Sequence, residues 1–384
     1  MLFDVNNRES KLSKVIPRGA RIAALFDTSF GYGTPQLELL MSSLAHFYEA
    51  SDCVMFEPDV KNKPKLRVAA PGIRIERLAT RFPPHFDVFH VEYNLQLIER
   101  ISDLKPNVLV VTSAAVMPAL LKLPYKPDLV IYYMLESIDY QRKLGGQDFV
   151  NLLQIGRSRI DLICVPEMNR ANFDLRYLGW DDIPVVEVLN VSLSKFIEGE
   201  KSQQPVIINA GSICESAQCD YFERDLPAHV RVDICGIPSS KRMIQMVDGF
   251  RSNVSQICYL GSLTMEELEE IYSRYAYSIC MWKPSDINQI HASPNKLFQS
   301  IAHGVPPIAA PHPQCVSIIR EYGCGILMDG WSFQDFYSAL ERAQKIYGTS
   351  TYHDMVENCR FATEHELNWP AQFSKLSSHL PTAA

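Results

Sequence analysis

The sequence predicts an α/β protein built from two parallel-sheet domains that face a cleft. Three observations support this prediction. Short apolar segments alternate with helical patterns along the first half of the chain, linker composition follows at 190–205, and the alternation then resumes. Strands that alternate with helices form βαβ units, which require a mainly parallel sheet. At 384 residues, the chain is long enough for two domains with a core each.

The first half of the chain, residues 1–190, predicts an amino-terminal domain. Apolar segments rich in β-branched and aromatic residues predict its strands, at 21–28, 52–58, 86–93, 107–114, 128–135, 160–166 and 184–189. Amphipathic segments between several of these strands predict its helices, at 35–50, 94–103, 146–158 and 167–178. This alternation predicts one mainly parallel sheet.

A linker at 191–204 precedes a second predicted domain at 205–348. The predicted strands of this domain lie at 205–211, 230–236, 255–261, 276–282 and 305–311. Its predicted helices lie at 239–250, 264–275, 294–303 and 333–347. Residues 349–384 have a helical pattern after a break at Gly348, and they could cross back to the amino-terminal domain.

Composition defines the broad class of the protein. Hydrophobic residues make up 47% of the chain and charged residues 21%, which is typical of a globular protein. The net charge of −7 argues against nucleic acid as a partner, because proteins that bind nucleic acid usually carry a basic surface. One segment, 61–81, is locally basic and could contact anionic lipid, with a solvated basic face as the alternative. Its cations are Lys61, Lys63, Lys65, Arg67, Arg74, Arg77 and Arg81.

The cysteines and apolar segments indicate the compartment. The ten cysteines form no C-x-x-C pair and no metal-like group with histidine, which indicates free thiols in a reducing environment. The amino terminus lacks the apolar core of a signal peptide, and no apolar run approaches the ~20 residues of a spanning helix. We therefore expect a cytoplasmic protein that could associate with the inner face of the membrane. No D-x-D motif stands at a convincing strand end, so we expect no obligatory metal ion.

Three successive predicted strands of the second domain end at glycine: Gly211, Gly236 and Gly261. In an open parallel sheet the carboxyl ends of the strands border the ligand crevice, and glycine permits close approach of the backbone. Ordinary turn chemistry is the alternative for any one of them. Three in succession favour a ligand-binding edge.

The helix predicted at 294–303 places a lysine in its first turn. Ser293 can cap this helix, Pro294 suits its first position and Gly304 can end it. Lys296 then faces the positive end of the helix dipole, which costs a few tenths of a kcal/mol up to ~1 kcal/mol. A bound anion would reverse that sign, because the free N–H groups and the ammonium would act together. A solvated lysine on the polar helix face is the alternative.

A longer run around this helix carries a resemblance to a known family. The run "ICYLGSLTMEELEEIYSRYAYSICMWKPSDINQIHASPNKLFQSIAHGVPPIAAP" resembles the carboxyl-terminal domain of bacterial glycosyltransferases of the GT-B fold, especially those related to family 4. Gly261, "EELEEIY", Pro284 and "SPNKLFQSIAHGVPPI" occupy the places of the family motifs in order. The likeness rests on motifs over 205–375 and on topology over 20–190. It implies two Rossmann-like α/β domains that face a cleft.

The resemblance also implies a function and the residues that carry it. The enzyme would be of EC 2.4 type and would transfer a sugar from a nucleotide diphosphate sugar, a UDP-sugar before a GDP-sugar, to a hydroxyl acceptor. That acceptor would be a sugar or a lipid-linked saccharide in surface polysaccharide or glycolipid assembly. Lys296 would contact the donor diphosphate at the helix start formed by Ser293, Pro294 and Asn295, and residue 299 would hold the ribose hydroxyls.

The chain departs from the family pattern at two positions. Gln299 stands where the family usually has glutamate, and its amide can still accept a hydrogen bond from a ribose hydroxyl. His291 stands where the E-x7-E pattern of many retaining members has its first carboxylate. A histidine does not reproduce that charge, so retention and inversion both stay open, and so does the level of activity.

A glycine pair follows the first predicted strand. Gly31 and Gly33 predict a turn ahead of a helix that starts near Pro35. The turn does not match G-x-G-x-x-G, so a dinucleotide site is a poor interpretation. By the resemblance, this turn would approach the acceptor and the sugar.

A carboxylate of the amino-terminal domain could act as the catalytic base. Glu136 ends a predicted strand and could deprotonate the acceptor hydroxyl if the enzyme inverts configuration. Asp139, His90 and Glu92 are the alternatives. Structural roles are also open: Glu136 can cap the next helix, Asp139 can pair with Arg142, and His90 can be a satisfied strand-end histidine.

Two other classes fit the same architecture. A sugar-nucleotide epimerase would need several acid and base residues in the cleft. A non-catalytic scaffold of the GT-B fold is the other alternative, suggested by the changes at His291 and Gln299.

Overall fold

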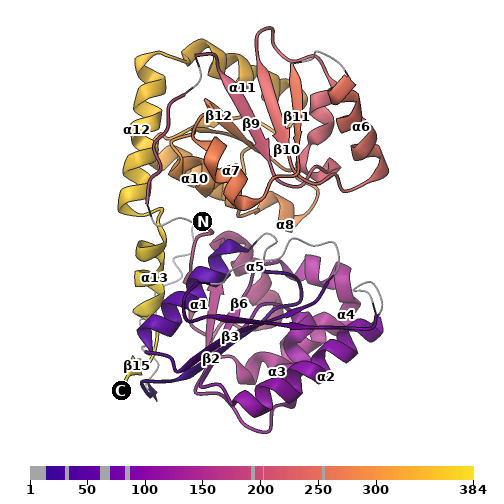
Figure 1. Ribbon diagram of the computed structural model, residues 1–384, viewed down its shortest axis with the longest axis vertical. Coiled ribbons are helices and arrows are strands. Elements are labelled where there is room, and N and C mark those ends of the chain that lie inside the picture. The colour runs from indigo at the N-terminus through magenta and orange to yellow at the C-terminus, as the bar shows by residue number, and fades with distance from the viewer. Residues whose placement is uncertain are drawn as a thin grey trace. The chain divides into compact units, whose positions relative to one another are not determined.

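The computed structural model describes residues 14–30, 34–60, 70–82, 87–191, 195–201, 203–252 and 256–384. The chain divides into two compact units. Unit 1 consists of Met1–Leu189 together with Gln372–Ala384, and unit 2 is Asn190–Ala371 (Figure 1). The chain therefore leaves unit 1 once and returns to it near the carboxyl end.

Within the described residues, unit 1 is built on a sheet of seven parallel strands. In spatial order they are β4 (Arg74–Leu78), β3 (Asp52–Pro58), β2 (Arg21–Leu25), β5 (Val108–Val111), β6 (Leu129–Tyr133), β7 (Leu162–Val165) and β8 (Val185–Glu187). β5, β6 and β7 are buried along their whole length, as expected of strands covered on both faces. The strand order reverses between β2 and β5, so the crevice beyond their carboxyl ends is where such a sheet binds ligands.

The helices of unit 1 supply the rest of its core. They are α1 (Pro35–Phe47), α2 (Asp87–Leu104), α3 (Met117–Lys122), α4 (Ile138–Gly156) and α5 (Met168–Leu178). Buried side chains of α2, α3, α4 and α5 pack with the strands in one cluster. In that cluster the rings of Tyr132 and Trp180 meet edge to face, with centroids 5.5 Å apart.

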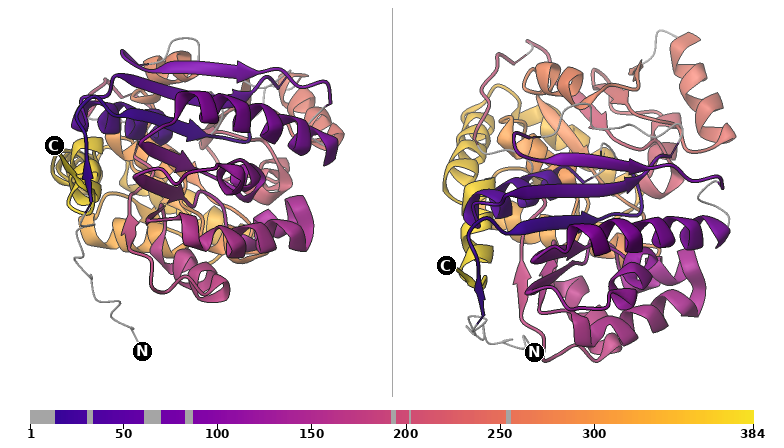
Figure 2. Two further views of the ribbon diagram at one scale, coloured as in Figure 1. Left: turned by 90° about the horizontal axis from the view of Figure 1, so that it is seen from below. Right: turned by 60° about the horizontal axis from the view of Figure 1, so that its bottom comes forward.

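The carboxyl end of the chain completes unit 1. α13 (Trp369–Ser377) carries the chain back, and β15 (Thr382–Ala383) pairs in parallel with β1 (Val15–Ile16). The Tyr48 hydroxyl donates a hydrogen bond to the Pro381 carbonyl (3.1 Å). Figure 2 shows this yellow carboxyl-terminal segment beside the indigo strand β1.

Unit 2 repeats the architecture with a sheet of six parallel strands in its described residues. In spatial order they are β11 (Ile257–Gly261), β10 (Arg231–Cys235), β9 (Val206–Ala210), β12 (Tyr277–Cys280), β13 (Pro307–Ala309) and β14 (Ile326–Leu327). Its α-helices are α6 (Lys241–Ser252), α7 (Met265–Tyr272), α8 (Ile287–Ile290), α9 (Asn295–Ala302), α10 (Pro313–Tyr322), α11 (Phe333–Ile346) and α12 (Ser350–His365). The strand order reverses between β9 and β12, which marks the ligand crevice of this sheet.

The strand predicted at 86–93 is wrong, because these residues begin α2. Phe89, Tyr93, Leu97 and Ile101 are all buried and lie four residues apart, so one helical face carries the apolar side chains. The short alternation of apolar and polar residues in "VFHVEY" suggested a strand instead. His90 therefore lies on a helix and not at a strand end.

Other differences arise where the apolar pattern is weak. β4 was not predicted, because this edge strand carries Arg74, Glu76 and Arg77 and buries little. α4 starts eight residues before the predicted helix at 146, and its backbone is non-helical at Gly145 and Gly146. Sequence reasoning also missed the short elements α3, α8 and β14, and it missed α10.

Several general features of the described residues bear on function. None of their helices is long and apolar enough to cross a membrane. These residues also contain no group of three His, Cys, Asp or Glu side chains that could hold a metal ion. All ten cysteines are free thiols.

Candidate functional site

The carboxyl ends of β9, β10 and β11 meet at one glycine-lined edge. Gly211, Gly236 and Gly261 have φ angles of 126°, 142° and 92°, a region that L-residues rarely adopt. The Gly211 N–H donates to the Cys235 carbonyl (3.0 Å), and the Gly236 N–H donates to the Gly261 carbonyl (2.9 Å). A Cβ on Gly236 would lie 1.7 Å from the Gly211 oxygen, so only glycine fits there. The predicted strand ends are thus confirmed. Because glycine has no side chain, backbone atoms border the crevice at these three positions.

Lys296 lies at the point where the strand order of unit 2 reverses. Its Nζ is 4.5 Å from the centroid of the Trp282 ring, which follows β12. The same Nζ is 3.4 Å from Oδ1 of Asn209 in β9. Among the described residues no carboxylate pairs with this ammonium, whose neighbours are a ring face and a neutral amide. A partly buried cation with neutral partners favours a bound anion.

The helix that carries Lys296 starts one residue later than predicted. Pro294 occupies the N-cap and Asn295 is the first helical residue. A proline cannot accept a hydrogen bond from first-turn N–H groups through its side chain, and the capping role predicted for Ser293 is wrong. The Ser293 carbonyl instead accepts a hydrogen bond from the Asn190 amide (2.8 Å). Gly304 ends the helix with φ 60°, as predicted.

Gln299 lies one turn after Lys296 on the same face of α9. Its side chain is buried, with 8% exposed, and its Nε2 makes no hydrogen bond. A buried donor without a partner costs about 1–3 kcal/mol. Such an amide is typical of a site whose ligand supplies the acceptor.

His312, which sequence reasoning missed, holds the loop that carries Trp282. The imidazole is fully buried between β13 and α10. Its Nε2 accepts a hydrogen bond from the backbone N–H of Trp282 (3.2 Å), which leaves Nδ1 to donate to the Ile290 carbonyl (3.1 Å). Burial lowers its pKa, and the nearby Lys296 charge acts in the same direction. A neutral histidine therefore positions the ring beneath the ammonium.

His291, predicted as a catalytic residue, follows α8 as its C-cap. It is partly buried and lies in the segment between α8 and Lys296. The fold thus brings it into the same loop region, and its catalytic role stays a prediction.

A second cluster lies at the strand-order reversal of unit 1. Asp27 follows β2, Ser113 follows β5, and His90 comes from α2. Burial raises the pKa of Asp27, while the neighbouring Ser113 hydroxyl and His90 imidazole act in the opposite direction. Burial lowers the pKa of His90, against the pull of the Asp27 charge. The cluster thus places a carboxyl group near an imidazole. Sequence reasoning named His90 and missed Asp27, although "RIAALFDT" places an acid just after a strand.

The loop after β6 holds the other predicted acids. Glu136 is partly buried between β6 and α4. Ser137, not Glu136, caps α4 by accepting a hydrogen bond from the Tyr140 N–H (3.1 Å). Asp139 pairs with Arg142 (2.6 Å), as predicted, and its role as an alternative base stays a prediction. Gly31 and Gly33 lie outside the described residues, as do residues 61–69 of the basic segment.

Comparisons with known proteins identify the fold. No protein-family model and no curated protein sequence matches the chain. Solved structures do match over nearly the whole length. The sucrose-phosphate synthase of Thermosynechococcus elongatus has a TM-score of 0.70 at 12% identity and covers 93% of this chain and 97% of its own.

Two further solved structures have the same architecture. The lipopolysaccharide outer core galactosyltransferase WaaB has a TM-score of 0.62 at 14% identity over 94% of this chain and 100% of its own. HepE of Anabaena, solved with UDP and glucose, has a TM-score of 0.66 at 9% identity over 93% and 98%. At these identities the likeness shows the fold alone. The chain therefore has the two-domain α/β architecture of the GT-B fold, as the sequence predicted.

Proposed function

We propose that this protein is a glycosyltransferase that moves a sugar from a UDP-sugar to a hydroxyl group of a saccharide or lipid-linked saccharide. The observation that carries the proposal is the Lys296 ammonium, which lies at the start of α9 between Trp282 and Asn209 without a carboxylate partner in the described residues. A diphosphate would supply the missing negative charge. HepE, which shares the fold, was solved with UDP, so UDP is the nucleotide that we propose before GDP.

The donor would bind along the carboxyl edge of the unit 2 sheet. Lys296 and the first-turn N–H groups of Asn295 and its neighbours would hold the diphosphate, while the backbone at Gly211, Gly236 and Gly261 lets the nucleotide approach closely. The unsatisfied Nε2 of Gln299 would donate to a ribose oxygen.

Transfer then needs one bond formed and one broken. The acceptor oxygen forms a bond to the anomeric carbon, and the bond between that carbon and the diphosphate oxygen breaks. Lys296 stabilises the charge that develops on the departing diphosphate. The acceptor proton passes to a base of unit 1, for which we propose the pair of Asp27 and His90, with Glu136 as the alternative. His291 would lie near the reacting sugar.

The setting of this reaction is part of the proposal. The acceptor would belong to surface polysaccharide or glycolipid assembly, and the enzyme would work in the cytoplasm, where the basic segment 61–81 could contact the inner face of the membrane. Among the described members of that segment, Arg74, Arg77 and Arg81 pair with acids.

Calorimetric titration of UDP into wild type and Lys296→Met tests the donor site. Methionine keeps an unbranched side chain over Trp282 and removes the charge. A charge-assisted hydrogen bond contributes about 1.5–3 kcal/mol, so we expect the UDP affinity to fall about 10- to 100-fold. Lys345→Met, on the exposed face of α11, is the matched control and should bind UDP like wild type. Equal UDP affinity in wild type and Lys296→Met would overturn the assignment.

An activity assay separates the proposal from its rivals. A glycosyltransferase releases UDP from a UDP-sugar much faster when an acceptor is present. An epimerase changes the sugar without an acceptor and releases no UDP. A scaffold binds UDP and does neither, so UDP binding without turnover across an acceptor panel would refute the transferase proposal.

A further inference from the structure

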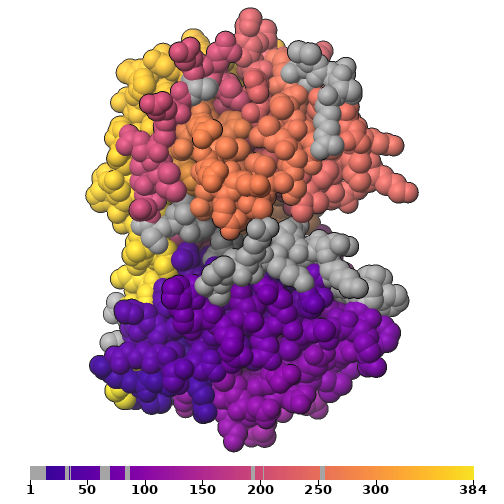
Figure 3. All heavy atoms as spheres, viewed as in Figure 1, coloured from indigo at the N-terminus to yellow at the C-terminus, as the bar shows by residue number. Residues whose placement is uncertain are grey.

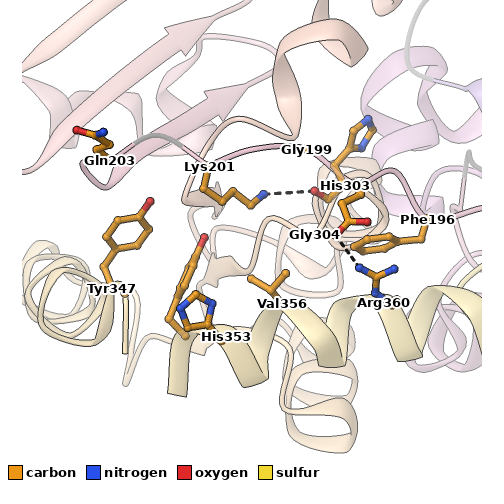
Figure 4. Close-up of a pocket in the computed structure, with 13 residues that line it drawn as sticks. Phe196, Gly199, Lys201, Gln203, His303, Gly304, Tyr347, His353, Val356 and Arg360 are labelled. Carbon is orange, nitrogen blue, oxygen red and sulfur yellow. Dashed lines mark hydrogen bonds and ion pairs between the residues drawn. The ribbon is translucent and has the colours of Figure 1, made fainter. Parts of the chain in front are cut away.

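A cavity lies in unit 2 beside the carboxyl end of α9, the helix whose first turn carries Lys296. It has a volume of about 320 Å³, at the small end of the range for small-molecule sites. One wall is formed by residues 196–201 and Gln203, which lie alongside α12 (Figure 3), and the other wall is α12 with the end of α11. Its lining residues include Phe196, Glu198, Lys201, Tyr347, His353 and Arg360 (Figure 4).

The first wall is fixed by close packing. The Ile197 N–H donates to the Ala302 carbonyl (2.7 Å). The Phe196 ring lies so near Gly304 that a Cβ there would be 2.8 Å from its Cζ. The Arg360 guanidinium lies 4.7 Å from the centroid of the same ring and pairs with Glu198 (2.9 Å). The cavity is therefore a built feature and not a gap between loosely packed segments.

Lys201 gives the cavity an unbalanced positive charge. Its Nζ donates to the Ser273 carbonyl (2.7 Å) and the His303 carbonyl (3.4 Å), at the ends of α7 and α9. Both partners are neutral, and no carboxylate pairs with this ammonium in the described part of the chain. Burial accordingly lowers the pKa of Lys201 to about 8. Arg360 differs, because Glu198 balances its charge.

Rings and aliphatic groups line the rest of the cavity. The Tyr347 and Tyr352 rings lie 4.8 Å apart, and the Tyr352 hydroxyl already donates to the Ala276 carbonyl (3.1 Å). Figure 4 shows Tyr347, His353 and Val356 along the side opposite the Lys201 chain. The site thus combines one cation that lacks a counter-charge with apolar and aromatic surface.

We propose that this cavity binds a small organic anion whose charged group lies at Lys201 and whose ring packs against Tyr347 and Val356. An ammonium has three donors, two of which are used by carbonyls, so one is left for the ligand. The apolar surface favours a ligand with a ring over a bare inorganic ion.

Such a ligand would touch both segments that link unit 2 to the rest of the chain. Residues 196–201 follow the first crossing between the units, after Leu189, and α12 precedes the second crossing, after Ala371. A ligand against both walls would tie these two segments together. Its lining does not include Lys296, Gln299 or the three strand-end glycines, which are the residues proposed to hold the donor.

Phenyl phosphate is the probe. Inorganic phosphate and phenol, which carry its charged group and its ring separately, are the comparison ligands. We expect phenyl phosphate to bind wild type in a calorimetric titration, inorganic phosphate to bind more weakly and phenol not to bind. Lys201→Met should weaken phenyl phosphate about tenfold to a hundredfold, because it removes a charge-assisted hydrogen bond. Lys296→Met should bind phenyl phosphate like wild type, and Lys201→Met should bind UDP like wild type, so the two sites are tested independently.

Lys201 also caps two helices, so a second variant guards against misfolding. Val356→Trp places a large side chain in the cavity from the partly exposed face of α12 and leaves Lys201 intact. It should lose phenyl phosphate binding while its unfolding temperature stays close to that of wild type. Absence of phenyl phosphate binding to wild type, or undiminished binding to Val356→Trp, would overturn the proposal.

Discussion

Asp174 is a buried acid beside Arg170, and its titration can be tested. The carboxyl group is 6% exposed in α5, next to the equally buried Arg170. Arg170 donates from Nη2 to the Leu135 carbonyl (2.8 Å), within the loop between β6 and α4. Oδ2 of Asp174 makes no hydrogen bond. Burial raises the pKa of Asp174 to about 7, against the opposing effects of Arg170 and the Ile138 N–H.

The raised pKa sets both the sign and the size of the effect. In the unfolded chain Asp174 ionises near pH 3.8, whereas in the folded protein it holds its proton up to about pH 7. The folded state thus binds more protons than the unfolded state between these values. The stability that protonated Asp174 contributes is therefore fully present below pH 3.8 and is lost as pH rises through about 7. The slope of 1.36 kcal/mol per pH unit applies up to about pH 7, where Asp174 ionises in the folded protein as well. Between pH 5 and pH 8 this group therefore lowers the free energy of unfolding by about 2.5 kcal/mol.

The perturbation is Asp174→Asn, which keeps the shape and removes the titration. Urea unfolding of wild type and variant at pH 5, 6, 7 and 8, followed by circular dichroism, gives the free energy of unfolding. The difference between the two proteins should change by about 2.5 kcal/mol over this range, in favour of the variant at high pH. Asp182→Asn, at an exposed ion pair with Arg157, is the control and should follow wild type, because exposed pairs contribute about 0–1 kcal/mol. Parallel pH profiles for wild type and Asp174→Asn would show that Asp174 is ionised in the folded protein.

Three further substitutions test the sites. Gly236→Ala should lower the free energy of unfolding by more than about 3 kcal/mol, because the new Cβ would lie 1.7 Å from a backbone oxygen. Gly249→Ala in α6 is the control: a Cβ there meets nothing within 4 Å, so the free energy of unfolding should stay the same or rise by up to about 1 kcal/mol. Urea unfolding of both variants measures the difference. His312→Phe should weaken UDP binding about tenfold in calorimetry, since the loop after β12 loses its anchor, and unchanged affinity would exclude a positioning role. Asp27→Asn should lower kcat about 10²- to 10⁴-fold while UDP affinity stays within about twofold, and an unchanged kcat would remove Asp27 from the proposed base.

The sequence predicts the fold well where burial is continuous. β5, β6 and β7 are apolar along their whole length, so their position and parallel pairing follow from the pattern. The apolar pattern predicts the wrong element at α2, because the helical spacing of Phe89 and Tyr93 coincides with a short alternation of apolar and polar residues. It does not predict β4, because this edge strand carries charged residues.

The candidate site was predictable only in part. Lys296 has a local signature, because helix signals around it show that a cation faces the wrong end of the dipole. His312 has no such signature: it lies 30 residues from Trp282 in the sequence, and only the fold brings the two together. Asp27 likewise gains its meaning from Ser113 and His90, which come from separate elements. Local periodicity in the sequence does not predict which side chains from separate elements meet at a sheet edge.

The pairing of β1 with β15 has a consequence for synthesis of the protein. Residues 372–384 belong to unit 1, yet they leave the ribosome after all of unit 2. At 5–20 residues per second, the roughly 180 residues of unit 2 take roughly 10–40 s to translate. Unit 2 can thus finish folding while unit 1 still lacks its last strand and the Pro381 carbonyl that accepts from Tyr48. The unit that is begun first is completed last.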